Sequence, residues 1–209
     1  KLIGDNMWAL VEDGSITKLI NNPKAMVIGD IQYSRNIFSF RWTNAEREAI
    51  GLYEVVFNNT KKKDEEYYIN TNQSFAFADG TVTASYGDAT AKAHADTLFT
   101  AADEDNGLGT EGEVKIRGLK YNKIRVIKKQ AAGELQKTDW YIVRKADANT
   151  AVPSAITNHR AAVRTKCAAM ETLVTNASNT AAIETLYTYT TDDDGVQSRP
   201  LGELPTLEV

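Results

Sequence analysis

Two Asp-Gly pairs, each set between two runs of alternating apolar and polar residues, constrain the fold of this chain more than any other feature. Asp13-Gly14 separates "MWALVE" from "SITKLI", and Asp79-Gly80 separates "SFAFA" from "TVTAS". An Asp-Gly pair between alternating runs is a strong short-range indication of a tight β-hairpin turn. The sequence therefore predicts two hairpins within its first 87 residues.

The remainder of residues 1–87 predicts further strands and one short helix. "AMVIGDIQY" and "LYEVVF" are strand candidates, and "TNAEREAIG" between them is a helix candidate. Thr43 and Glu46 have the spacing of a capping box, and Gly51 stands where the helix would end. We expect a β-rich N-terminal domain with one short helix over residues 1–87, in which the charged run at 58–66 is a solvent-facing loop.

From Asp88 onward the pattern becomes mostly helical, and a second domain is predicted over residues 88–209. The alanine-rich "DATAKAHADTLFTAAD" predicts one helix, and "GLKYNKIRVIKKQAAGELQ" predicts another after a glycine-containing break. "DWYIVRK" alternates and predicts a strand near residues 139–145, with Trp140, Ile142 and Arg144 on one side. Pro153 suits the first turn of the helix that follows.

That last helix carries a narrow apolar stripe, typical of a helix that packs on a partner helix. The stripe consists of Ile156, Val163, Cys167, Met170 and Val174. A shorter helix, capped by Ser178 or Asn179, would complete a helical hairpin. From about Thr188 two prolines and an acidic run predict an extended tail. The predicted fold class is α+β: a β-rich N-terminal half with hairpins, followed by a mostly helical C-terminal half containing one strand and a helical hairpin.

Composition narrows the classes of partner. The formal net charge of the 209 residues is -4 with the basic residues scattered, which argues against nucleic-acid binding. No apolar run approaches the roughly 20 residues of a membrane span. Residues 1–12 lack the pattern of a signal peptide, and Cys167 is the only cysteine, which suits a reducing cytoplasm. We expect a soluble protein made in the cytoplasm, with no membrane or nucleic-acid partner.

The sequence offers no recognisable cofactor or catalytic motif. It has no phosphate-binding glycine loop and no GxSxG elbow, and its carboxylates do not single out a catalytic pair. His94, His159 and Cys167 lack the spacing of a zinc site, and His159 is expected on a helix surface. "DEDNGLGTEGE" lacks the glycine that an EF-hand loop requires at its sixth position. We therefore predict no metal, no cofactor and no enzymatic activity.

Arg160 and Arg164 are the most informative polar residues, because they lie one helical turn apart beside the apolar stripe. Like charges so placed repel, which predicts acidic neighbours such as Asp139, Asp147 or Glu171. Two interpretations remain open: an internal ion-pair network that ties the helix to the segment before it, or a docking surface for another chain.

The segment "DWYIVRKADANTAVPSAITNHRAAVRTKCAAMETL" resembles the C-terminal region of phage tail-assembly-chaperone and tail-fibre-assembly proteins. The matching positions include an Asp-Trp-Tyr step, Arg144, Pro153 and the "RAAVR" run from Arg160 to Arg164, while His159 stands where the family often has tyrosine. Most of the remaining chain is similar to marine-phage virion proteins of unassigned function. The resemblance covers about a fifth to a quarter of the chain for the C-terminal segment and carries no catalytic residue across.

The resemblance implies a structural component of a bacteriophage tail, associated with the fibre or baseplate and acting by protein–protein interaction. The alternative is a tail or tail-fibre assembly chaperone that is not retained in the virion; an enzyme acting on host glycans is a third class, for which no acid and nucleophile stand out. Expected partners are other tail or fibre proteins, in a homo-oligomer or hetero-assembly. We expect the stripe to be buried with Trp140 close to it, and to be presented to a neighbouring chain. The predicted interaction residues are Trp140, Arg144, Ile156, Arg160, Val163, Arg164 and Met170.

Overall fold

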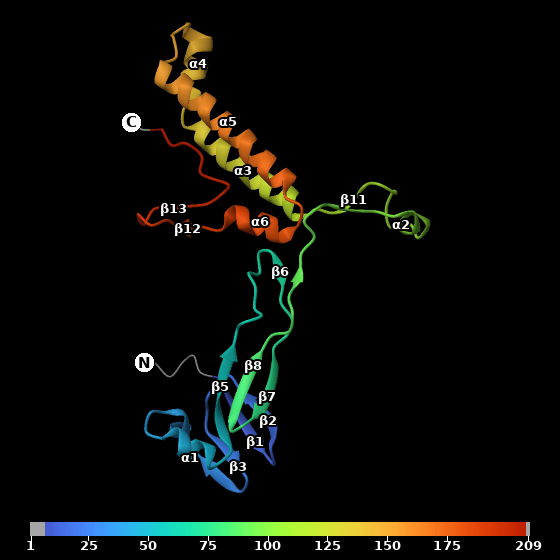
Figure 1. Ribbon diagram of the computed structural model, residues 1–209, viewed down its shortest axis with the longest axis vertical. Coiled ribbons are helices and arrows are strands. Elements are labelled where there is room, and N and C mark those ends of the chain that lie inside the picture. Colours follow the sequence, from blue (N-terminus) through green and yellow to red (C-terminus); the bar gives the residue numbers. More distant parts are fainter. Residues whose placement is uncertain (1–6, 208–209) are drawn as a thin grey trace. The chain divides into compact units, whose positions relative to one another are not determined.

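The computed structural model describes residues 7–207, which form two compact units that divide after Thr90. The first unit is β-rich and the second is mostly helical (Figure 1). The α+β class, with a β-rich N-terminal half and a helical C-terminal half, is therefore confirmed.

A five-stranded sheet in the order β2-β1-β5-β8-β7 forms the first unit. Its strands are β1 (Trp8–Glu12), β2 (Ser15–Ile20), β5 (Leu52–Asn58), β7 (Ser74–Ala78) and β8 (Thr81–Ser85). All adjacent pairs are antiparallel except β5 and β8, which run parallel. The smaller elements are β3 (Met26–Ile28), β4 (Ile31–Tyr33), the 3-10 helix η1 (Arg35–Phe38), α1 (Asn44–Glu48), β6 (Tyr68–Ile69) and β9 (Thr90–Ala91).

Both predicted hairpin turns are present. Asp13 and Gly14 have φ values of 49° and 74°, and Asp79 and Gly80 have values of 50° and 71°. Positive φ at both central residues defines the type I′ turn, whose twist matches that of the flanking strands. The two Asp-Gly pairs thus set the registers of the β1–β2 and β7–β8 ladders.

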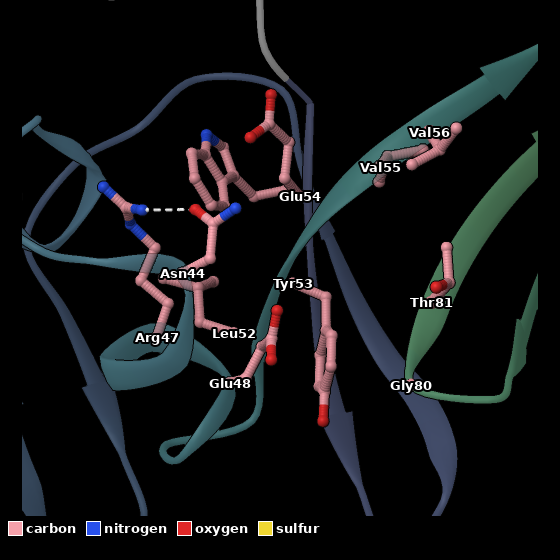
Figure 2. Close-up of a pocket in the computed structure, with 11 residues that line it drawn as sticks. Asn44, Arg47, Glu48, Leu52, Tyr53, Glu54, Val55, Val56, Gly80 and Thr81 are labelled. Atoms are coloured by element: carbon pink, nitrogen blue, oxygen red, sulfur yellow. Dashed lines mark hydrogen bonds between the residues drawn. The ribbon is translucent and has the colours of Figure 1, made fainter.

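Helix α1 begins with the capping box that the sequence predicts. The Thr43 side chain accepts the backbone N–H of Glu46, while the Glu46 carboxylate accepts the backbone N–H of Thr43 at 2.7 Å. Arg47 is buried, and its guanidinium donates to the Ile37 carbonyl at 2.7 Å and to the Asn44 side chain at 2.9 Å (Figure 2). Arg47 therefore fixes α1 to the segment that contains η1.

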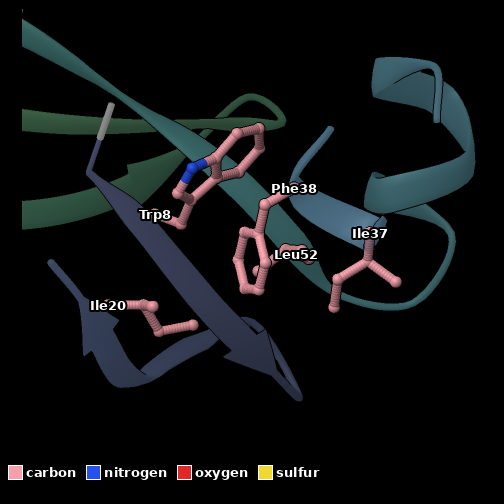
Figure 3. Close-up of a cluster of buried hydrophobic side chains, with 5 residues drawn as sticks. All are labelled: Trp8, Ile20, Ile37, Phe38 and Leu52. Carbon is pink, nitrogen blue, oxygen red and sulfur yellow. The ribbon is translucent and has the colours of Figure 1, made fainter. Parts of the chain in front are cut away.

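The core of the first unit covers both faces of β1. On one face Trp8, Ile20, Ile37, Phe38 and Leu52 form a buried cluster, in which the rings of Trp8 and Phe38 meet edge to face at 5.6 Å (Figure 3). On the other face the alternate residues of β1 join a second cluster, Ala9, Val11, Val55, Val82 and Ala84. Because successive side chains of a strand point to opposite faces and both faces are covered, β1 is apolar from Trp8 to Val11, and Glu12 at its end is exposed.

We predict that Gly51→Ala destabilises the first unit by about 1 kcal/mol or more beyond the cost of Gly14→Ala. Both glycines have positive φ, but only at Gly51 would a Cβ atom lie 2.5 Å from a backbone atom, the carbonyl oxygen of Val11. Val11 donates its N–H to the Gly51 carbonyl at 2.8 Å. Moving Gly51 away from Val11 to relieve the clash would therefore break this hydrogen bond. Denaturant unfolding of both variants measures the difference, and equal losses would contradict the steric explanation.

The second unit is built on a helical hairpin. Helices α3 (Leu119–Gln136) and α5 (Ser154–Asn176) pack side by side, and α4 (Asp139–Ala148) lies in the connection between them (Figure 1). The other helices are α2 (Ala101–Asp105) and α6 (Thr180–Tyr187), and the short strands are β10 (Thr97–Leu98), β11 (Val114–Ile116), β12 (Thr190–Thr191) and β13 (Gln197–Ser198). Ile127, Met170, Val174 and Leu201 form a buried cluster in this unit.

The predicted strand near residues 139–145 is wrong, because this segment is helix α4. A strand requires a neighbouring strand to accept its backbone hydrogen bonds, and none of the described strands lies beside this segment. As a helix, the segment satisfies its own backbone groups. The strands described in the helical half are instead short and form two pairs, β10 with β11 and β12 with β13.

Two further predictions for the helical half need correction. The alanine-rich segment from Asp88 is helical only at α2, since the carbonyls of Ala93 and His94 accept the first N–H groups of α3. The tail from about Thr188 is not simply extended, because β12 pairs with β13 and Leu201 is fully buried. Tertiary hydrogen bonds and apolar burial override the local preference at both places.

Residues 97–116 form an arm in which β10 and β11 pair around α2. Thr100 and Asp103 form a capping box, and the ammonium of Lys115 lies 2.7 Å from Asp103. The hydrogen bond from Lys115 and those from the backbone and hydroxyl of Thr100 lower the pKa of Asp103 to about 2. The arm is thus held in shape by its own residues.

Candidate interaction surface on helix α4

Arg160 anchors the start of α4 to α5. Its Nη1 atom lies 2.7 Å from the Leu135 carbonyl, 2.7 Å from the Thr138 hydroxyl and 2.8 Å from the Asp139 carboxylate. The Leu135 carbonyl belongs to the last turn of α3, where backbone acceptors lack partners within the helix. Arg160 is only 8% exposed, so it joins the end of α3, the turn and the first turn of α4 from inside.

The side chains of α4 itself point largely to solvent. None of its ten residues is buried, and Trp140 and Val143 are 52% and 65% exposed. The Arg144 guanidinium lies 4.6 Å from the centre of the Trp140 ring, which in turn contacts the Tyr141 ring at 4.4 Å. Trp140, Val143 and Arg144 share one side of the helix by their spacing, whereas Ile142 lies on the opposite side.

We call Trp140, Val143 and Arg144 the α4 surface. Large apolar side chains that gather on an exposed helix are typical of a protein-interaction site. Tryptophan and arginine are also the residue types that contribute most to binding energy at interfaces. Because Arg160 holds the start of α4, the α4 surface is presented by an anchored element.

The apolar stripe of α5 is buried within its own unit, as the sequence predicts. Its fully or nearly fully covered members are Ile156, Val163, Met170 and Val174, while Cys167 is half-buried. Side chains that their own unit covers are not available to a neighbouring chain, so presentation of the stripe to a partner is wrong. Trp140, which was predicted to lie close to the stripe, is 52% exposed.

The two arginines of α5 have different surroundings. Arg160 takes part in the predicted internal network, with Asp139 as its acidic partner. Arg164 is exposed, and its Nη1 atom lies 3.5 Å from the Arg160 carbonyl, with no acidic partner within residues 7–207. Glu171, another predicted partner, pairs instead with Lys128 at 3.2 Å. The predicted interaction residues therefore divide into the exposed Trp140 and Arg164, the half-buried Arg144, and the buried remainder.

Sequence reasoning missed Val143 because a strand pattern assigned it to the side opposite Trp140 and Arg144. In a helix, residues three and four apart lie on one side, which brings these three together. The expectation of a surface position for His159 is also wrong, because its side chain is buried. Helical indexing of residues 139–148 would have found the α4 surface.

A separate pocket of about 320 Å³ lies in the first unit between α1, β5 and the β7–β8 turn (Figure 2). Its lining includes Arg47, Glu48 and Glu54. The Arg47 guanidinium already bonds backbone and side-chain oxygens and lies 4.9 Å from the centre of the Trp8 ring, so its role is structural. Among the described residues that line this pocket there is no histidine, cysteine or lysine, and hence no pairing of such a base with a nucleophile.

The described side chains also bear on a metal site and on a reactive thiol. Within residues 7–207 no group of three or more histidine, cysteine or acidic side chains is arranged to hold a metal ion. Burial and a hydrogen bond to Glu171 raise the pKa of Cys167, which makes its thiol a poor nucleophile. None of the helices described between residues 7 and 207 is long and apolar enough to span a membrane.

No protein-family model, curated protein or solved structure matches this chain. The geometry of the α4 surface is therefore the basis for its interpretation.

Proposed function

We propose that this protein is a structural component of a bacteriophage tail, associated with the fibre or baseplate, and that it acts by protein–protein interaction rather than catalysis. The observation that carries the proposal is the α4 surface, in which a tryptophan and a valine are exposed on an anchored helix. The segment that resembles tail-assembly proteins begins at Asp139 and corresponds to α4 and most of α5.

The proposed partner of the α4 surface is a neighbouring tail or fibre protein. An exposed tryptophan with an arginine stacked on its ring supplies a large contact area and a fixed positive charge. Such a surface fits an apolar recess with an acidic group at its edge. The Arg160 network supports this role indirectly, since it holds the surface before any partner binds.

The test uses mass spectrometry of purified virions, together with two variants of the chain. Trp140→Ala/Val143→Ser should melt close to the parent, within about 1 kcal/mol, because both residues are exposed. Its incorporation into particles should fall at least about tenfold, as expected when an interface anchor is lost. The matched control is Ile142→Ser, which removes an exposed apolar residue from the opposite side of α4 and should incorporate normally.

Absence of the chain from mature virions would overturn the structural role. If the absent chain then co-purified with a fibre protein from infected cells, the tail-assembly chaperone would replace it. Normal incorporation of Trp140→Ala/Val143→Ser would keep the tail assignment but reject the α4 surface as the contact.

A further inference from the structure

Positive charge is concentrated on the helical hairpin, although the chain as a whole is acidic. Residues 119–176 contain eleven lysines and arginines against four aspartates and glutamates, whereas the formal net charge of all 209 residues is -4. Several of these basic groups are used internally, as Arg160 and Lys128 show. Arg125 and Lys129 are basic residues of this segment that form no ion pair within residues 7–207.

Both residues lie on α3, opposite its buried side. Arg125 and Lys129 are one turn apart and exposed, and neither has an acidic partner within residues 7–207. Tyr121 and Val126 are exposed beside them, with Val126 at 46%. We call these four residues the α3 basic face. It combines two unpaired cations with an apolar contact area.

The arm carries the opposite combination. Asp105, Glu111 and Glu113 are exposed at its tip and have no basic partner within the described part of the chain. Leu108 lies among them and is 62% exposed. The arm's own lysine, Lys115, is already paired with Asp103. We call Asp105, Leu108, Glu111 and Glu113 the arm tip.

The arm tip has a defined shape without a partner. Phe99 donates its N–H to the Glu113 carbonyl at 2.9 Å, and Gly112 donates to the Phe99 carbonyl at 3.0 Å. The Glu104 carboxylate accepts the Glu111 N–H at 2.9 Å. These bonds hold the loop that displays Leu108 and its acidic neighbours, so binding would cost little ordering of the loop.

We propose that the arm tip of one chain docks on the α3 basic face of a second copy. Each surface pairs exposed apolar area with charge that its own chain leaves uncompensated, and the two charges are opposite. No ion pair joins the two surfaces within the described residues of one chain. Since the two surfaces differ, two chains either exchange the contact reciprocally in a two-fold dimer or repeat it head-to-tail in a ring or an open filament.

The contact should weaken with salt. Its ion pairs would lie at an exposed surface, where the Debye length is about 8 Å at physiological ionic strength and about 3 Å at 1 M. Sedimentation velocity of the full chain across protein concentration, at low salt and at about 1 M salt, measures this. The expected result is association at low salt that falls at least about tenfold at high salt, with Leu108 and Val126 retaining a weak contact.

Charge-swap variants identify the two surfaces. Arg125→Glu/Lys129→Glu reverses the α3 basic face, and Asp105→Lys/Glu111→Lys reverses the arm tip. Each variant alone should associate at least about tenfold more weakly, because like charges would face each other. An equimolar mixture of the two should associate again, since each arm tip then meets a face of opposite charge.

A matched control, Lys18→Glu/Lys24→Glu, makes the same change of charge at two exposed lysines of the first unit. It should associate like the parent, and circular dichroism of every variant checks that the fold is retained.

A parent that stays monomeric at low salt, or a mixture that fails to restore association, would overturn the proposal. Salt-dependent binding of a monomeric parent to a single-stranded DNA probe, lost in Arg125→Glu/Lys129→Glu, would assign the α3 basic face to nucleic acid instead. None of these outcomes depends on the tail assignment.

Discussion

Replacing Met170 with alanine is expected to lower the free energy of unfolding of the helical unit by about 2–5 kcal/mol. Met170 is 1% exposed and belongs to the cluster that also contains Ile127, Val174 and Leu201. Truncation removes the buried thioether and leaves a cavity that rigid neighbours on α3 and α5 fill only partly. Thermal and denaturant unfolding, followed by the helical circular dichroism signal, measures the loss.

The matched control for this change is Leu173→Ala, on the same helix but with a residue that is 40% exposed. It loses less buried area than Met170→Ala and should cost less than about 1 kcal/mol. Since Leu201 shares the Met170 cluster, the Met170 variant should also increase hydrogen exchange at the Leu201 amide, which donates to the Leu186 carbonyl at 3.0 Å. Equal losses in the two variants would show that Met170 is not a core residue.

Local chemistry made the first unit predictable. A type I′ turn needs only Asp-Gly and two alternating flanks, and a capping box needs only Thr43 and Glu46 at the right spacing. Both are decided by residues within a few positions of each other. The burial of Met170 and Val174 was predictable for a similar reason, because the period of an amphipathic helix is written along α5 itself.

The errors arose where distant residues decide the local structure. The alternation in "DWYIVRK" fits a strand, but no described strand lies beside it to complete a sheet. The alanine-rich segment after Asp88 has high helical propensity, yet its carbonyls at Ala93 and His94 bond the start of α3. Leu201 is buried by the helical unit despite the polar tail around it. None of these partners is adjacent in sequence.

The candidate site was half predictable for the same reason. The repulsion between Arg160 and Arg164 predicts an acidic neighbour, and Asp139 is that neighbour. Whether Asp139 pairs with Arg160 or with Arg164 depends on where the connection between α3 and α4 passes α5. Treating residues 139–145 as a strand also separated Val143 from Trp140, and so concealed the α4 surface.

Replacing Arg160 with alanine is expected to lower the free energy of unfolding of the helical unit by about 1.5–3 kcal/mol, the usual range for hydrogen bonds to a charged group. The change removes the cation that contacts the Leu135 carbonyl, the Thr138 hydroxyl and the Asp139 carboxylate. The loss should stay below that of a fully buried ion pair, because the Asp139 side chain is 55% exposed and water can solvate it.

Two variants distinguish the Arg160 network from a simple loss of charge. Arg164→Ala removes an equal charge one turn away and should melt within about 0.5 kcal/mol of the parent, because Arg164 is exposed and has only a long contact to the Arg160 carbonyl. Arg160→Lys keeps the charge but not the planar fork of donors, so it should recover only part of the loss.

In Arg160→Ala, hydrogen exchange should rise first at α4, because the start of this helix loses its anchor. Normal melting of Arg160→Ala, or equal losses in the Arg160 and Arg164 variants, would show that Arg160 does not hold α4 in place. The α4 surface would then lack its preorganised support.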